Sequence, residues 1–248
     1  MLADLRRAFS LLTVLPFGGA SDTEGSPGRA MAYFPLVGAV VGGVLVGVGA
    51  LLEWSGLTAH VSLLSAALVL VVWVVLTGAL HLDGWADCCD GLFVPVERTR
   101  RLEIMKDPHV GGFGVVGLVL LLLVKWAALV WVLTSSRYLL ILVAVPAVAR
   151  WTVVIAAKGF VSARPGGMGD VFRGGFGRWG LAVATVVALA AAAPLLWLGA
   201  VIWAAAALAF LALAFFARAR LGGLTGDVYG GVVELGETAA LVALCFIL

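Results

Sequence analysis

The sequence predicts an all-α protein, a polytopic bundle of about seven transmembrane helices with an N-terminal interfacial helix, in one domain over residues 1–248. Hydrophobic residues make up 63% of the chain and charged residues 12%, against about 25% charged in soluble domains. This composition excludes a soluble enzyme, and a net charge of +2 gives no basis for nucleic-acid binding. The uncharged runs are long, whereas β-barrel strands are short and alternating.

The predicted spans follow from these runs, because about 20 helical residues cross a bilayer core. Single spans are expected at 30–52, 54–82, 110–136, 138–157 and 228–248. The run 179–217 has 39 uncharged residues, which as one helix would be about twice as long as a bilayer core is thick. We therefore expect it to fold back near residues 194–199 and to form two spans.

The N-terminal segment 1–17 has the pattern of an amphipathic helix. Its apolar residues recur at helical spacing, at Leu2, Leu5, Phe9, Leu12 and Leu15. A helix of this kind lies in the membrane interface with its apolar side buried.

The basic residues predict the orientation, since cytosolic loops are enriched in Lys and Arg. On the predicted topology, thirteen of the sixteen basic residues lie in segments on one side, one lies on the other side and two lie within spans. We expect a multi-pass protein of the bacterial inner membrane with its N-terminus in the cytosol. Thirteen of the fourteen acidic residues belong to the same cytosolic half, which is where we expect the active site.

The densest acidic cluster is the segment HLDGWADCCDG at 81–91. On a helix, Asp83, Asp87 and Asp90 fall on one stripe. Carboxylates so close together repel one another, and a divalent cation would relieve the repulsion. All-oxygen ligands favour Mg²⁺ or Mn²⁺ over zinc. The alternatives are a solvated acidic helix end and a proton relay.

Glycines accompany the acidic residues in both acidic segments. Gly84 and Gly91 flank the first stripe, and Gly230 and Gly231 lie in the second acidic segment, 226–237. We interpret them as positions without a side chain that let a bulky ligand approach the helix backbone.

The second acidic segment enters the last predicted span. Asp227 and Glu234 are two helical turns apart on one face, and Glu234 and Glu237 lie inside the span. An ionised carboxylate there needs a partner. The partner is either a second metal ion or the substrate, or else an intramembrane ion pair with Arg150 or Lys125.

Basic residues near these acids are candidates for binding phosphate. Lys106 and Asp107 precede a glycine-rich entry into the third span, which favours a phosphate clamp beside a metal ligand. Arg164 begins a loop that is either an anion site or a flexible turn, and Arg150 faces either a phosphate or a carboxylate. Together these features indicate a membrane transferase that acts on a diphosphate with metal assistance.

Two other classes compete with this interpretation. CDP-alcohol phosphotransferases and UbiA-type prenyltransferases also use two aspartate-rich motifs, but the residues around the motif at 81–91 differ from theirs. A cation- or proton-coupled transporter would place its acids near mid-bilayer, whereas most of these cluster at one membrane face.

The motifs resemble those of the cobalamin synthase (adenosylcobinamide-GDP ribazoletransferase) family. The likeness runs in order through FSLLTVLP at 9–16, YFPLVG at 33–38, HLDGWADCCDG at 81–91, RLEIMKD at 101–107, ARP at 163–165 and LTGD at 224–227. It covers nearly the whole chain, and the combination of the 81–91 motif with MKD downstream is specific.

The resemblance implies a Mg²⁺-dependent late step of cobalamin biosynthesis. The ribose hydroxyl of α-ribazole, or of its 5′-phosphate, attacks the cobinamide-side phosphate of adenosylcobinamide-GDP, and GMP leaves as adenosylcobalamin or its 5′-phosphate forms. Membrane lipid surrounds the enzyme, and either a homo-oligomer or association with other corrinoid enzymes is compatible with this role.

The resemblance also implies roles for particular residues. Asp83, Asp87 and Asp90 would be catalytic and bind the metal with Asp227 and Glu234, and Asp87 or Asp90 would accept the hydroxyl proton. The implied substrate-binding residues are His81, Arg101, Lys106, Asp107, His109, Arg150, Arg164 and Glu237.

Overall fold

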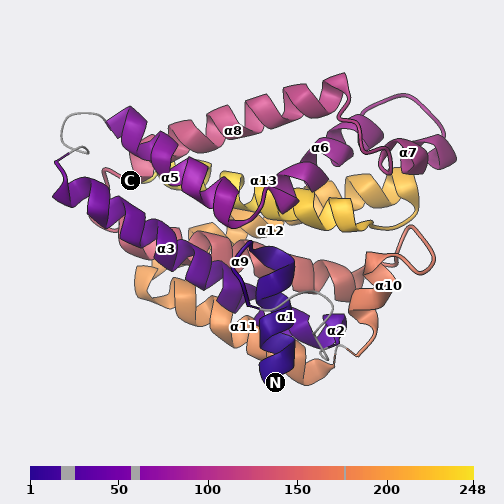
Figure 1. Cartoon of the computed structure of the whole chain (residues 1–248), viewed down its shortest axis with the longest axis horizontal. Helices are drawn as coiled ribbons and strands as arrows, with labels where there is room; N and C mark the ends of the chain where they lie inside the picture. Colours follow the sequence, from indigo (N-terminus) through magenta and orange to yellow (C-terminus); the bar gives the residue numbers. More distant parts are fainter. Residues whose placement is uncertain (18–25, 57–61, 176) are drawn as a thin grey trace.

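The computed structural model describes residues 1–17, 26–56, 62–175 and 177–248, and every regular element within these ranges is helical. The long helices run along the long axis of the molecule (Figure 1). The elements are α1 (Leu2–Leu12), α2 (Pro27–Ala30), η1 (Met31–Tyr33), α3 (Phe34–Trp54), α5 (Ser62–Leu76), α6 (Leu80–Leu92), α7 (Arg98–Ile104), α8 (Gly112–Val132), α9 (Tyr138–Gly159), α10 (Met168–Arg173), α11 (Arg178–Ala192), η2 (Ala193–Leu195), α12 (Trp197–Leu221) and α13 (Gly226–Cys245).

The number of spans agrees with the sequence. Among the described residues, six helical segments are long and apolar enough to cross a membrane, and the bent pair α5–α6 makes a seventh if it is counted as one span. The short helices α7 and α10 lie together at one end of the bundle, and the C-terminus lies at the other (Figure 1). The all-α polytopic prediction is confirmed.

Helices α9 and α13 form the centre of the bundle. In each of them, 72% of the membrane-spanning segment is buried, compared with 22–39% in the other long helices that could cross a membrane. Glycines allow α3 to pack against α9, since a Cβ at Gly38 or Gly42 would collide with the backbone at Pro146 or Leu142. Small residues at crossings let helix backbones approach closely in a membrane.

The outer helices present apolar side chains outward. On α8, Val115, Val119, Leu120 and Leu123 are each more than half exposed. Lipid tails are compatible with such a surface, whereas water is not. The peripheral helices therefore supply the lipid-facing wall, and the buried charges Lys125, Arg150, Glu234 and Glu237 lie on the inner sides of α8, α9 and α13.

The second span differs from its prediction. Helix α3 continues to Trp54, and α5 and α6 are separate helices whose axes meet at 89°. The chain turns at Gly78 (φ +59°) and Ala79 (φ +56°), a left-handed conformation that glycine adopts without strain. The span expected over 54–82 is therefore bent and displaced along the chain, into α5 and α6, and residues 57–61 of that prediction lie outside the described residues.

The predicted fold-back near residues 194–199 is confirmed. Helix α11 ends at Ala192, η2 covers Ala193–Leu195, and α12 starts at Trp197 after Leu196 (φ +54°). Pro194 ends the helical pattern because it lacks an N–H donor.

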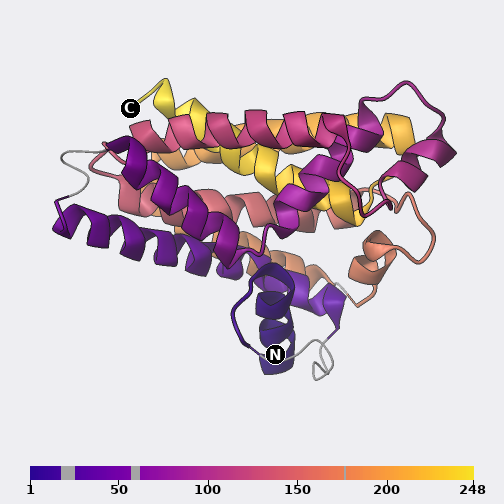
Figure 2. The same cartoon turned by 45° about the horizontal axis from the view of Figure 1, so that its top comes forward.

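The N-terminal segment forms α1, a helix that lies across the long helices (Figure 2). Ala8, Phe9 and Leu12 are buried against the bundle, so the amphipathic helix is confirmed. Asp4 accepts hydrogen bonds from the Arg29 Nε and the Ser26 N–H (3.2 and 3.1 Å), which tie α1 to α2.

Candidate active site

The acid-bearing helices α6 and α13 cross with their backbones in contact. A Cβ on Gly84 would lie 2.6 Å from the Asp227 carbonyl oxygen, and a Cβ on Gly230 would lie 3.2 Å from the His81 carbonyl oxygen. The space at Gly91 and Gly231 is filled by other side chains. These glycines therefore serve helix packing, and the interpretation that they leave room for a ligand was wrong.

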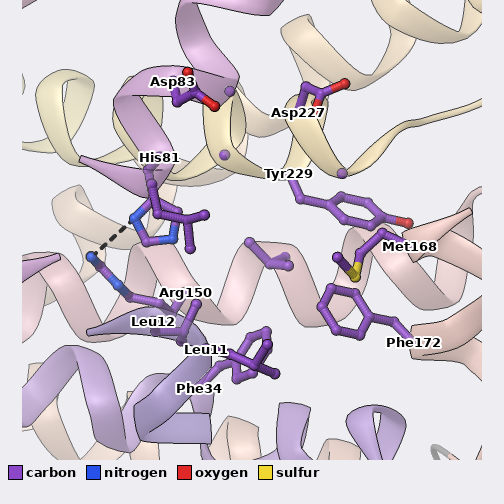
Figure 3. Close-up of a pocket in the computed structure, with 15 residues that line it drawn as sticks. Leu11, Leu12, Phe34, His81, Asp83, Arg150, Met168, Phe172, Asp227 and Tyr229 are labelled. Carbon is purple, nitrogen blue, oxygen red and sulfur yellow. Dashed lines mark hydrogen bonds between the residues drawn. The ribbon is translucent and has the colours of Figure 1, made fainter. Parts of the chain in front are cut away.

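The crossing brings Asp83 and Asp227 to the same edge of a pocket (Figure 3). Asp83 is exposed, and Asp87, one turn further along α6, is half-buried. Asp87 lies within electrostatic range of Asp227, Asp83 and Asp90, with Arg164 as the opposing cation. Within the described ranges, no hydrogen bond occupies the Asp87 carboxylate. Two sequence motifs that are far apart in the chain thus form one acidic cluster.

Asp227 is held at the first turn of α13. Thr225 caps this helix by accepting a hydrogen bond from the Val228 N–H (3.3 Å), and its hydroxyl donates to the Asp227 carboxylate (3.1 Å). An Arg164 Nη lies 3.5 Å from the same carboxylate, and Arg164 also donates to the Leu102 carbonyl (3.1 Å). A fixed cation therefore stands beside the acidic cluster.

Asp90 is engaged in the backbone of the next span. Its two carboxylate oxygens accept hydrogen bonds from the N–H groups of Gly111 (2.7 Å) and Gly114 (2.8 Å). These groups belong to the N-terminus of α8, where backbone donors lack partners in the helix and a negative charge is favoured. Asp90 thus joins α6 to α8.

The loop between α6 and α8 contains the predicted phosphate-binding residues. Arg101 is buried and donates to the Gly91 and Leu92 carbonyls (both 2.9 Å), so it caps the end of α6. Lys106, Asp107 and His109 are exposed. The backbone N–H and ring of His109 donate to Asp107 (3.0 and 2.7 Å) and lower the pKa of its carboxyl.

Glu234 and Glu237 take part in a buried ion-pair network rather than in the aspartate cluster. Lys125 on α8 lies 2.8 Å from a Glu234 oxygen and also pairs with Glu237, and Arg150 on α9 pairs with Glu237. Glu237 is fully buried. The structure therefore has the ion pairs that the sequence left open as the alternative, because a buried carboxylate needs a compensating charge.

The pocket beside the aspartates lies between α1, α3, α6, α9, α10 and α13 (Figure 3). Its volume is about 200 Å³. His81 and Arg150 form one wall, where an Arg150 Nη lies 3.4 Å from the His81 Nδ1. The other walls are mostly apolar: Leu11, Leu12, Phe34, Val153, Met168, Phe172 and Tyr229.

The structure separates the predicted site residues into three groups. The first surrounds the pocket and the acidic cluster: His81, Asp83, Asp87, Arg150, Arg164 and Asp227. The second joins or caps helices, namely Asp90 and Arg101, or pairs inside the bundle, namely Glu234 and Glu237. Lys106, Asp107 and His109 remain on the exposed loop.

Sequence reasoning missed the apolar half of the pocket. Phe34, Phe172 and Tyr229 come from three distant segments. Phe34 lies in the YFPLVG motif and Tyr229 lies two residues after Asp227, but neither position indicates that the rings share a pocket. Only the tertiary packing brings these rings together.

The comparisons with known proteins agree with one another. A family model described as Cobalamin-5-phosphate synthase matches residues 4–245. An adenosylcobinamide-GDP ribazoletransferase of Geotalea daltonii is 43% identical over 238 residues, which are 95% of this chain and 93% of the relative. Proteins of the same name from Pseudomonas paraeruginosa and Desulforamulus reducens are 41% and 36% identical, over 98% and 96% of this chain and 98% and 94% of theirs. No solved structure matches the chain significantly. The chain belongs to the cobalamin-5-phosphate synthase family.

Proposed function

We propose that the chain is an adenosylcobinamide-GDP ribazoletransferase. It transfers adenosylcobinamide phosphate to the ribose hydroxyl of α-ribazole, or of its 5′-phosphate, and releases GMP. Family membership over nearly the whole chain supports the reaction. The observation that carries the location of the site is the crossing of α6 and α13, which places Asp83 and Asp227 at one edge of a pocket.

The carboxylates of Asp83, Asp87 and Asp227 suit a divalent cation. Among the described residues, no three His, Cys, Asp or Glu side chains are already arranged to hold a metal ion. Mg²⁺ usually binds through one or two carboxylates together with substrate phosphates and keeps several waters, so the diphosphate would supply the remaining ligands. When bound, Mg²⁺ would neutralise the diphosphate oxygens and stabilise the leaving phosphate. Hard oxygen donors gathered with one opposing cation, Arg164, support this assignment.

Asp87 is the best placed proton acceptor. The acceptor hydroxyl oxygen attacks the cobinamide-side phosphorus, its proton passes to a carboxylate, and the bond from that phosphorus to the bridging oxygen of GMP breaks. Both oxygens of Asp90 accept backbone hydrogen bonds, whereas the half-buried Asp87 carboxylate faces the other acids. Proton transfer by a positioned side chain contributes typically about 10²–10⁴-fold to the rate.

Arg164 is the best placed cation for the diphosphate, because it already lies 3.5 Å from Asp227. A substrate phosphate arriving with Mg²⁺ would find the Arg164 guanidinium at the same edge. Arginine binds phosphate well because its planar fork matches two phosphate oxygens. Lys106 and His109, on the exposed loop between α7 and α8, would reach the more solvent-exposed part of the donor.

The site lies on the cytosolic side of the bacterial inner membrane in this proposal. The helix ends at α7 and α10 lie at one end of the bundle (Figure 1), and the loops there carry most of the basic residues. An excess of Lys and Arg is typical of cytosolic loops.

Turnover by the purified full-length protein in liposomes tests the proposal. With Mg²⁺, adenosylcobinamide-GDP and α-ribazole, we expect a cobalamin and GMP in equal amounts. Addition of EDTA should stop the reaction, and excess Mg²⁺ should restore it. If well-folded protein forms neither product, the proposed transferase activity is refuted. Full activity in EDTA would refute the proposed dependence on a divalent metal ion.

A further inference from the structure

Aromatic rings from three separate helices line the pocket beside Asp83 and Asp227. Phe34 belongs to α3, Phe172 to α10 and Tyr229 to α13. The Phe34 and Phe172 rings meet edge to face with centroids 5.7 Å apart, and the Phe172 and Tyr229 centroids are 6.0 Å apart at 31°. Figure 3 shows Tyr229 and Phe172 on one side of the cavity and Leu11 and Leu12 below it. Such walls suit a flat ring, since aromatic rings pack by offset stacking or edge to face.

The size of the pocket limits its occupant. A volume of about 200 Å³ is below the roughly 300–1,000 Å³ of pockets that hold drug-sized ligands. The cavity therefore suits one fused ring system and is too small for a corrin macrocycle or a whole nucleotide.

The acidic edge selects between the two substrates. In a nucleoside, the base and the ribose hydroxyls are separated by only a few bonds, so a base in the pocket places the sugar beside Asp83 and Asp227. In the donor, a ribose and a phosphate separate the guanine from the phosphorus that is attacked. A guanine in this pocket would hold the reacting phosphorus away from the carboxylates.

The polar wall adds a hydrogen-bond donor. Arg150 is 1% exposed, and within the described part of the chain its Nε has no hydrogen-bond partner. The base of α-ribazole is a benzimidazole, which has one ring nitrogen with a free lone pair and is otherwise apolar. Guanine carries several donors and acceptors, which an apolar wall of Phe34, Phe172 and Met168 would leave unpaired at a cost.

We propose that this pocket binds the benzimidazole base of the acceptor nucleoside, between the Phe172 and Tyr229 rings and the α1 residues Leu11 and Leu12. The ribose hydroxyl then projects toward Asp83 and Asp227. This inference rests on the proposed function, and it makes Phe172 and Leu11 specificity residues for the acceptor alone.

Steady-state kinetics with the two substrates varied separately test the proposal. Phe172→Leu removes one ring, and Leu11→Trp fills the cavity from the half-buried face of α1. For Phe172→Leu we expect a three- to tenfold higher KM for α-ribazole, which corresponds to about 0.6–1.4 kcal/mol of lost aromatic contact. For Leu11→Trp we expect at least a tenfold rise. The KM for adenosylcobinamide-GDP should stay within twofold in both variants.

Phe210→Leu is the matched control, because Phe210 on α12 is buried against Phe160, which follows α9, and does not line the pocket. Size-exclusion profiles and thermal unfolding of each variant exclude misfolding as the cause of a kinetic change. A higher KM for the donor, or an unchanged KM for α-ribazole in both variants, would overturn the assignment of the pocket. Wild-type protein without any turnover would instead refute the proposed function.

Discussion

The Lys125 ammonium on α8 lies 2.8 Å from the Glu234 carboxylate on α13, and both side chains are at least 95% buried. Lys125 also pairs with Glu237 and lies 4.3 Å from the centroid of the Trp73 ring. Since Arg150 pairs with Glu237 as well, two cations and two anions balance inside the bundle. The network joins α8, α9 and α13 at the level where α6 begins.

Removal of Lys125 should therefore destabilise the protein strongly. Lys125→Met leaves Glu234 without its cation in a buried position, and we expect a loss of about 3–5 kcal/mol in the free energy of unfolding. Denaturant unfolding in detergent measures it. Arg100→Met is the control, because the exposed Arg100–Glu103 pair (3.0 Å) should cost only about 0–1 kcal/mol. Equal losses of unfolding free energy in the two variants would contradict a stabilising role for the buried ion pairs.

A double variant sharpens this prediction. If Lys125→Met acts by stranding a charge, adding Glu234→Gln should recover part of the lost stability, because Glu237 retains Arg150 as its partner. Additive losses would indicate that Lys125 matters for packing instead.

Gly84→Ala should separate the acid-bearing helices. The added Cβ would lie 2.6 Å from the Asp227 backbone oxygen, so α6 must move away from α13 and Asp83 away from Asp227. We expect a loss of 1–3 kcal/mol, the approximate cost of overpacking, and at least a tenfold fall in kcat. Gly43→Ala on α3 is the control, since a Cβ there meets nothing within 4 Å. Unchanged kcat in Gly84→Ala would show that the crossing does not set the site.

Asp83→Asn should abolish turnover and leave the fold intact. The Asp83 side chain is exposed, so the substitution removes a charge from the site without emptying the core. We expect kcat to fall at least a hundredfold, with thermal unfolding unchanged within measurement error. Glu53→Gln, an acid hydrogen-bonded to Tyr138 (2.8 Å) away from the cluster, should keep wild-type kcat. Wild-type activity in Asp83→Asn would remove this carboxylate from the mechanism.

The attachment of α1 should depend on pH through Asp4. Burial raises the pKa of the Asp4 carboxyl, but hydrogen bonds from Arg29, the N-terminus and Ser26 outweigh it and hold this pKa below the ordinary 3.8. The contribution to stability is thus complete above pH 3.8 and lost as the pH falls through the lowered value. In a thermal unfolding series from pH 6 to 3, the wild type should have a higher Tm than Asp4→Asn at pH 6. This difference in Tm should shrink below pH 3.8. A Tm difference that stays constant across this pH range would contradict a role for the ionised Asp4 carboxylate.

The sequence predicted the spans because lipid dictates their length and composition, as the fold-back around Pro194 illustrates. It also located the aspartates, since charges are rare in such a chain. It could not show that Asp90 binds the α8 N-terminus or that Arg101 caps α6. Those roles depend on where other helices end. The glycine interpretation was wrong for the same reason, because Gly84 has its neighbour more than 140 residues away in the sequence.

The bend at Gly78 and Ala79 has a consequence for biogenesis. Helix α5 has 15 residues and α6 has 13, so each alone is shorter than the roughly 20 residues that cross a bilayer core. Helix α6 carries three aspartates and packs through Gly84 on α13, which begins more than 130 residues later in the chain. The second span therefore cannot reach its final position as it leaves the ribosome. Its packing partner exists only once α13 has been made.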